Sequence, residues 1–163
     1  MDTKNAEFQH LKLAQIYESF NQFSEDENFW LWTIHQLNIS DITDFGCWTW
    51  LLTHKLMELW YSVRWIEPAG AMLEQARSKE WSEKIEYIEW DYKKLGKSST
   101  ELILMTSHVA QFIWEDEWED FLQKSYWALK DWWYILFDSK NPIPKPWENY
   151  TREKCNKTKD TPL

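Results

Sequence analysis

The chain has little cysteine and no long apolar run. Its two cysteines, Cys47 and Cys155, cannot build a disulfide framework, so we expect a reducing, cytoplasmic setting. No apolar run approaches the roughly 18–20 residues that a membrane-spanning helix needs, and the first residues contain no signal-peptide core. No His and Cys residues have zinc-site spacing, so we expect no metal. Membrane, disulfide-scaffold and zinc proteins are thereby disfavoured.

Basic residues are also in deficit. The chain holds 18 Lys and Arg against 27 Asp and Glu, which gives a formal net charge of −9. Nonspecific binding to nucleic acid needs a basic surface that attracts phosphates. We therefore expect no nucleic-acid partner and no membrane partner, and the sequence leaves the oligomeric state open.

Glycine is the scarcest residue relative to expectation. Only 3 of 163 residues are glycine, whereas soluble proteins average about 7%. Tryptophan is correspondingly abundant, with 14 copies. Tight turns between strands and helices ordinarily require glycine, so these two numbers need a common explanation.

Short apolar segments alternate with helical periodicity along most of the chain. Strands are predicted at Ile42–Phe45, Ser62–Ile66, Ile85–Glu89, Leu102–Met105 and Tyr134–Asp138. Helices are predicted at Asn5–Phe20, Ser24–Leu37, Leu51–Leu59, Ala69–Ser78, Ser107–Ile113 and Asp116–Leu129. This alternation predicts an α/β, Rossmann-like, doubly wound and mostly parallel sheet of about five strands, with helices on both faces.

Three segments are expected. Residues 1–38 form an N-terminal helical lid, residues 39–142 form the sheet domain, and residues 143–163 form a polar C-terminal extension. The second helix begins with Ser24 followed three residues later by Glu27, the pattern of a capping box.

The predicted strand ends carry polar residues. In a doubly wound sheet, ligands bind at the carboxyl ends of the strands. The first strand ends at Asp44 and runs into the loop through Gly46, a strand–loop–helix arrangement typical of a nucleotide-like ligand. Glu67, 21 residues after Gly46, could accept hydrogen bonds from a ribose diol, and Asp91 from an exocyclic amine. The fourth strand leads into Met105–His108, and the fifth ends at Asp138.

Four motifs in order make a resemblance specific. The segments are Asp44–Trp50, Val63–Arg77, Tyr87–Asp91 and Ala128–Tyr134. Together they resemble the cofactor loop, the acidic second-strand segment, the adenine-contacting strand end and the turn into the fifth strand of class I S-adenosylmethionine-dependent methyltransferases. That family ordinarily has two further strands, and no strand signal follows Asp138, so the resemblance predicts that the chain is C-terminally truncated.

The resemblance implies S-adenosylmethionine as the cofactor and methyl transfer to a small-molecule or protein substrate. The implied cofactor-binding residues are Tyr17, Asp44, Gly46, Cys47, Trp48, Glu67, Pro68, Asp91, Tyr92 and Thr106. Asp44 and the loop would face the methionine part, Glu67 the ribose and Asp91 the adenine, with Tyr17 closing as a lid. A base is needed only if the acceptor carries a proton. His108, after the fourth strand, is the candidate, and a helix-capping or core-packed histidine is the structural alternative.

Tryptophan stands where the family pattern or a turn calls for glycine. The positions are Trp48, Trp50, Trp60, Trp65, Trp81, Trp90, Trp114, Trp132 and Trp133. One hypothesis explains both unusual counts: the source gene uses a codon for glycine that was translated as tryptophan. Deliberate substitution and a naturally Trp-rich chain are the alternatives. As written, Trp48 and Trp50 are expected to fill the space that the methionine end of the cofactor needs.

Other functions remain in competition. An inactive, methyltransferase-like binding domain would follow if the loop tryptophans block the cofactor. A nicotinamide-dependent oxidoreductase is disfavoured because the loop lacks the Gly-x-Gly-x-x-Gly spacing. A binding module that stacks sugars or bases on exposed tryptophans would need them on one face, whereas the pattern places them at turns.

Overall fold

The computed structural model describes residues 23–46, 50–79, 85–89 and 92–141, with the single positions 10, 12, 15, 83, 143 and 145. Five parallel strands form one sheet in the order β3-β2-β1-β4-β5. Their bounds are β1 Asp41–Phe45, β2 Ser62–Glu67, β3 Glu86–Glu89, β4 Thr100–Met105 and β5 Leu129–Phe137. The predicted α/β class, the five strands and their parallel arrangement are confirmed.

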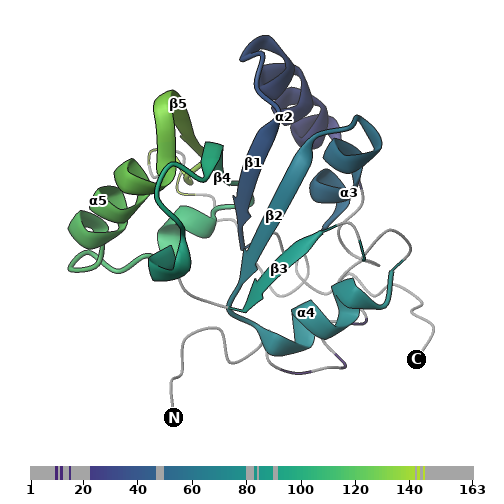
Figure 1. Cartoon of the computed structure of the whole chain (residues 1–163). Coiled ribbons are helices and arrows are strands. Elements are labelled where there is room, and N and C mark those ends of the chain that lie inside the picture. The colour runs from purple at the N-terminus through teal and green to yellow at the C-terminus, as the bar shows by residue number, and fades with distance from the viewer. Residues whose placement is uncertain are drawn as a thin grey trace.

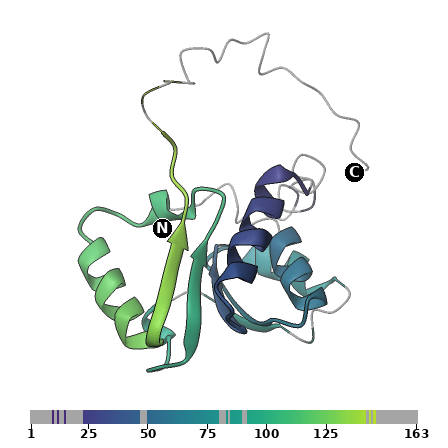
Figure 2. The ribbon, with the colours of Figure 1, turned by 90° about the horizontal axis from the view of Figure 1, so that it is seen from above.

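The helices lie on both faces of this sheet. Their bounds are α2 Glu25–Gln36, α3 Leu51–Glu58, α4 Gly70–Arg77 and α5 Trp118–Ala128, with short 3₁₀ helices η3 Tyr92–Lys94 and η4 Val109–Phe112. Figures 1 and 2 show α2 and α3 on one side of the sheet and α5 on the other. The segment predicted as a helix at Ser107–Ile113 is the 3₁₀ helix η4. Of the predicted helix Asn5–Phe20 the structure describes only positions 10, 12 and 15, of which 12 and 15 are helical.

Helix α2 begins at the predicted capping box. The Glu27 carboxylate accepts a hydrogen bond from the Ser24 backbone N at 2.6 Å, and Ser24 Oγ accepts one from Asp26 N at 3.2 Å. These contacts satisfy main-chain groups that the first turn leaves without intrahelical partners. Ile34 anchors the helix on the sheet, where its side chain is fully buried.

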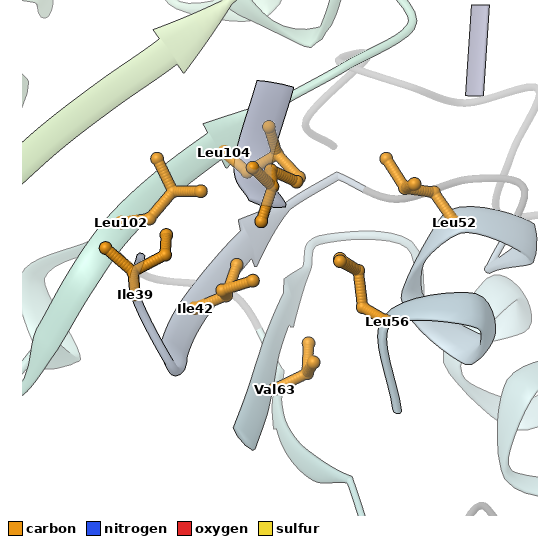
Figure 3. Packing of buried hydrophobic residues seen from close by; sticks show 8 residues of the cluster. Ile39, Ile42, Leu52, Leu56, Val63, Leu102 and Leu104 are labelled. Carbon is orange, nitrogen blue, oxygen red and sulfur yellow. The ribbon is translucent and has the colours of Figure 1, made fainter. Parts of the chain in front are cut away.

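The core follows the two-residue alternation of the strands. Figure 3 shows the cluster beneath α2 and α3, made of Ile34, Ile39, Ile42, Leu52, Leu56, Val63, Leu102 and Leu104. Ile103 and Met105, which alternate with Leu102 and Leu104 along β4, belong to the opposite cluster with Phe121 of α5. Both faces of β4 are therefore buried, which accounts for its continuous apolar sequence.

Strand β5 is longer than the strand predicted from the sequence. It begins at Leu129 rather than at the predicted Tyr134, and a register irregularity lies between Thr100 and Leu102 where β5 joins β4. Lys130, at its start, contacts Asp41 of β1 at 3.0 Å, which ties this end of β5 to the centre of the sheet. Trp133 consequently lies inside a strand and not at a turn.

The strand order defines the position of the site. From β1 the chain moves outward through β2 to β3, and it then returns to β4 on the other side of β1. The order reverses between β1 and β4, so their carboxyl ends flank the crevice at which ligands bind in such sheets.

Candidate functional site

Asp44 closes the central strand with a buried carboxylate. Its side chain is fully buried, and Oδ2 accepts a hydrogen bond of 2.6 Å from Thr53 Oγ1 on α3. Two residues later Gly46 has φ 62°, a conformation that glycine adopts without a Cβ clash. The Gly46 N–H donates to Ile66 O at 2.8 Å and thereby fixes the start of the loop against the end of β2.

Glu67 is the second buried carboxyl group at this edge. Its side chain is fully buried at the end of β2, and Oε1 accepts a hydrogen bond of 2.8 Å from Ala69 N. Oε2 is buried and has no hydrogen-bond partner among the residues that the structure describes. Burial chiefly raises the pKa of Glu67 to about 8; the Ala69 N–H opposes this shift, and the charge of Asp44 adds to it. Glu67 is therefore protonated at neutral pH in this structure.

The unpartnered Oε2 tests whether the site fits the implied cofactor. A buried oxygen without a donor costs roughly 1–3 kcal/mol unless a ligand supplies one. Ribose carries two adjacent hydroxyl groups that can donate to a carboxyl group. Glu67 thus offers the acceptor that the ribose hydroxyls need, and in this respect the site fits the implied cofactor.

A mainly apolar pocket opens beside the two carboxyl groups. Its lining residues are Phe45, Gly46, Pro68, Tyr92, Met105, Val109, Phe112, Ile113, Glu117 and Phe121. Three of the residues predicted to bind the cofactor, Gly46, Pro68 and Tyr92, therefore share one pocket. Apolar and aromatic walls with few polar groups are typical of sites for flat organic ligands.

Tyr92 is held rigidly in the pocket wall. Its ring packs edge-on against Phe121 with centroids 5.5 Å apart, and its hydroxyl donates to Asp120 Oδ2 at 2.9 Å. Phe121 also packs edge-on against Phe45, at 5.7 Å. These contacts connect α5 to the ends of β1 and η3, so the pocket is formed from both halves of the sheet.

The segment after β4 carries the remaining predicted residues. Thr106 is buried, and its carbonyl accepts a hydrogen bond from Val109 N at 3.3 Å. Ser107 and His108 both have positive φ, 56° and 65°. The His108 N–H donates to Asp138 Oδ1 at 2.9 Å, and His108 Nδ1 lies 2.6 Å from Asp138 Oδ2. This second contact is short but not aligned as a hydrogen bond within the described part of the chain.

Trp50 lies in the core. The side chain is 2% exposed and packs with Trp65, Leu73 and Ala76, and it is not among the residues that line the pocket. Its backbone is left-handed, with φ 34°, and leads into α3. The expectation that Trp50 fills the cofactor space stays a prediction. The same expectation for Trp48 lies outside the described residues.

The tryptophans at glycine-like positions divide into two groups. Trp50 and Trp60 have positive φ, 34° and 70°, which is the backbone that favours glycine. Trp65 lies inside β2, within the predicted strand Ser62–Ile66, whereas Trp133, expected at the turn into the fifth strand, lies inside β5. Trp65 is fully buried against Tyr87, with centroids 5.4 Å apart. The codon hypothesis stays a hypothesis.

The structure also shows residues that the sequence did not single out. Thr53, which donates to Asp44, and Phe121, which forms the pocket wall, had no predicted role. Asp138 was recognised only as the end of the fifth strand. Tyr17, Cys47 and Asp91, together with Trp48, lie outside the described residues. The described residues hold no cluster of His, Cys, Asp and Glu suited to a metal ion, and none of their helices is long and apolar enough to cross a membrane.

Comparisons with known proteins identify the fold. No protein-family profile matches the chain, and no curated protein matches it. A solved S-adenosylmethionine-dependent methyltransferase from Mesorhizobium loti matches with a TM-score of 0.55 at 22% identity, over 63% of this chain and 48% of that one. The CcbJ methyltransferase from Streptomyces caelestis matches with a TM-score of 0.64 at 14% identity, over 80% and 56%. The glycopeptide N-methyltransferase MtfA, complexed with S-adenosylhomocysteine, matches with a TM-score of 0.56 at 10% identity, over 68% and 50%.

The fold is thus that of the class I S-adenosylmethionine-dependent methyltransferases, as the four sequence motifs predicted. The chain spans about half the length of these three structures. At such low identities the likeness concerns the fold, and the chemistry has to be argued from the site.

Proposed function

We propose that this chain binds S-adenosylmethionine and transfers its methyl group to a small-molecule or protein acceptor. The observation that carries the proposal is the fully buried Glu67, whose Oε2 has no partner among the described residues and whose neighbour Pro68 lines the apolar pocket. A diol-binding carboxyl group next to a pocket for a flat ring is the arrangement that a nucleoside needs. The fold shared with methyltransferases supports the same ligand.

Each residue of this site would have a separate part in holding the ligand. Glu67 would accept from the ribose hydroxyls, and Tyr92 and Pro68 would contact the adenine ring inside the pocket. Asp44, with its carboxylate fixed by Thr53, would supply negative charge near the methionine part, which carries an ammonium group. Gly46 would let the main chain approach the ligand closely. The cofactor supplies an electrophilic methyl group, and the protein supplies alignment and exclusion of water.

The acceptor is proposed only by class. The net charge of −9 does not favour a nucleic acid, which leaves small molecules and protein side chains. A cytoplasmic location is proposed on the low cysteine content.

Calorimetry with S-adenosylhomocysteine on the full chain tests the binding step. We expect binding to the unaltered chain and at least tenfold weaker binding to Glu67→Gln, because the carboxylate that forms when Glu67 releases its proton to bind the ligand makes hydrogen bonds worth about 1.5–3 kcal/mol, which an amide cannot replace. Glu74→Gln makes the same chemical change at an exposed position on α4 and should leave the affinity unchanged. Absence of binding by the unaltered chain, or equal affinity of Glu67→Gln, contradicts the proposal.

Transfer is a separate question from binding. A chain that binds S-adenosylhomocysteine but never labels an acceptor from methyl-tritiated cofactor would be a methyltransferase-like binding domain. Binding of NAD in place of S-adenosylhomocysteine in the same calorimeter would instead favour the oxidoreductase alternative.

A further inference from the structure

The turn after β4 is strained. Ser107 and His108 are consecutive non-glycine residues in the left-handed region, with φ 56° and 65°. Such residues cost on the order of 1–3 kcal/mol each and persist only where the surroundings hold them. The turn lies at the carboxyl edge of the sheet, and its neighbours Met105 and Val109 line the pocket.

Asp138 holds this turn at three points. Its Oδ1 accepts from the His108 main-chain N–H at 2.9 Å, and its Oδ2 lies 2.6 Å from His108 Nδ1. Its own main-chain N–H donates to Met105 O at 3.3 Å. One residue at the end of β5 therefore fixes both the main chain and the ring of the histidine that follows β4.

The short distance between Nδ1 and Oδ2 selects a tautomer. An Nδ1 lone pair 2.6 Å from a carboxylate is repelled by its negative charge, whereas a proton on Nδ1 is attracted to that charge even without hydrogen-bond alignment. The neutral ring then carries its lone pair on Nε2. The His108 side chain is 39% exposed, so the ring is partly open to solvent, and the residue is the chain neighbour of Val109, which lines the pocket.

We propose that Asp138 is a positioning residue that holds His108 with its proton on Nδ1, so that Nε2 takes a proton from a hydroxyl or amine acceptor. The inference rests on the proposed function and narrows its acceptor class. The acceptor's lone pair bonds to the methyl carbon while the carbon–sulfur bond breaks and its electron pair stays on sulfur. The acceptor's proton passes to Nε2 and then to water. A carboxylate acceptor has no proton to give, so Nε2 would contribute nothing to its methylation, and the proposed role of His108 applies to hydroxyl and amine acceptors.

The tautomer can be measured without any acceptor or cofactor. Long-range proton–nitrogen NMR on protein labelled with ¹⁵N-histidine distinguishes a protonated ring nitrogen from a bare one. The chain has four histidines, and the His108 signals are assigned by their loss in His108→Gln. We expect His108 to be bare at Nε2 in the unaltered chain and to become a mixture of tautomers in Asp138→Asn. Asp138→Glu, which keeps a carboxylate, should restore part of the Nε2-bare form.

His35 lies on α2, away from this turn, and supplies an internal control because its signals should not change in either variant. A His108 ring that is bare at Nδ1, or a tautomer ratio equal in the unaltered chain and Asp138→Asn, overturns the proposal. A structural role alone for Asp138 would lower stability without shifting the tautomer, so denaturation is recorded in parallel. If S-adenosylhomocysteine fails to bind while the tautomer behaves as expected, the proposed function fails and the positioning role stands.

A methylation panel tests the acceptor class. Alcohols, phenols, amines and carboxylic acids are incubated with methyl-tritiated cofactor and the unaltered chain. Labelling of a hydroxyl or amine that falls at least tenfold in His108→Gln supports the assignment. Labelling confined to carboxylic acids overturns it, as does equal labelling by His108→Gln.

Discussion

The carboxyl groups of Asp44 and Glu67 are both buried near the ends of adjacent strands; burial raises the pKa of Glu67, and the charge of Asp44 adds to this shift. Thr53 donates to Asp44, so that carboxyl group has a neutral donor to stabilise its charge, while Glu67 keeps an unpartnered oxygen. Two like charges this deep are costly, and the structure relieves the cost by retaining a proton on one of them. The proton on Glu67 should affect both the pH dependence of stability and the binding of a ligand.

Stability should fall with rising pH because of Glu67. Its pKa is about 8 in the folded protein against 4.5 for an ordinary glutamate, so the unfolded chain binds fewer protons between these values. The free energy of unfolding contributed by this group is complete below about pH 4.5. It then declines by up to about 1.4 kcal/mol per pH unit until about pH 8. Urea denaturation across this window should show the decline in the unaltered chain and a much smaller one in Glu67→Gln.

The exposed variant Glu74→Gln controls for loss of a negative charge. It should reproduce the pH dependence of the unaltered chain. A Glu67→Gln protein whose stability follows the same pH curve as these two would show that Glu67 is already ionised at neutral pH.

Ligand binding should release a proton from Glu67. A neutral carboxyl group accepts hydrogen bonds less well than a carboxylate, which can accept from both hydroxyls of a diol. Binding of S-adenosylhomocysteine at neutral pH is therefore expected to release about one proton. Calorimetry in two buffers of different ionisation enthalpy measures this number from the difference in observed heat. Equal heats in the two buffers would contradict the prediction.

Removing the donor to Asp44 should destabilise the fold. Thr53→Val keeps the side-chain shape and deletes the hydroxyl that donates to Asp44 Oδ2, which leaves this buried acceptor without that bond. We expect a loss of about 1–3 kcal/mol in the free energy of unfolding. Thr53→Ser retains the hydroxyl and should lose less. The prediction fails if urea denaturation gives the two variants the same stability.

Trp60→Gly should stabilise the protein. The side chain is 91% exposed and its backbone has φ 70°, so glycine removes strain of about 1–2 kcal/mol while little burial is lost. Trp32 is also exposed but lies within α2, so Trp32→Gly should instead cost about 0.5 kcal/mol of helix propensity. Thermal denaturation that moves both variants in the same direction would refute this account.

Trp50→Gly should have the opposite sign to Trp60→Gly. The backbone strain at φ 34° is also relieved, but the ring is buried with Trp65 and Leu73, and emptying such a site costs roughly 3–5 kcal/mol. Cavity cost exceeds strain relief, so net destabilisation is expected in urea denaturation. A more stable Trp50→Gly would instead favour the hypothesis that glycine belongs at this position.

The sequence predicted the sheet because each strand is a short apolar run between helical repeats. It also placed Asp44, Gly46 and Glu67 at strand ends, where the structure has them, because the end of a strand is a local feature of the sequence. It did not predict Thr53 as the hydrogen-bond partner of Asp44, since the sequence of a helix does not indicate which buried group a threonine on it contacts. Phe121 likewise read as one member of an apolar helix stripe. The start of β5 was missed because Ala128–Tyr134 was interpreted as the turn into the fifth strand, whereas this segment pairs with β4 from Leu129 onward.

The central position of β1 also determines how the chain must fold. One edge of β1 pairs with β2, where Ile42 lies opposite Val63. Its other edge pairs with β4, where Ile42 lies opposite Leu102, and β4 comes much later in the sequence. During synthesis some sixty residues must leave the ribosome between the two halves of this pairing. Contacts so distant in sequence form slowly, and meanwhile an unpaired apolar strand is open to other chains. One edge of β1 therefore stays open to association with other chains until β4 has been made.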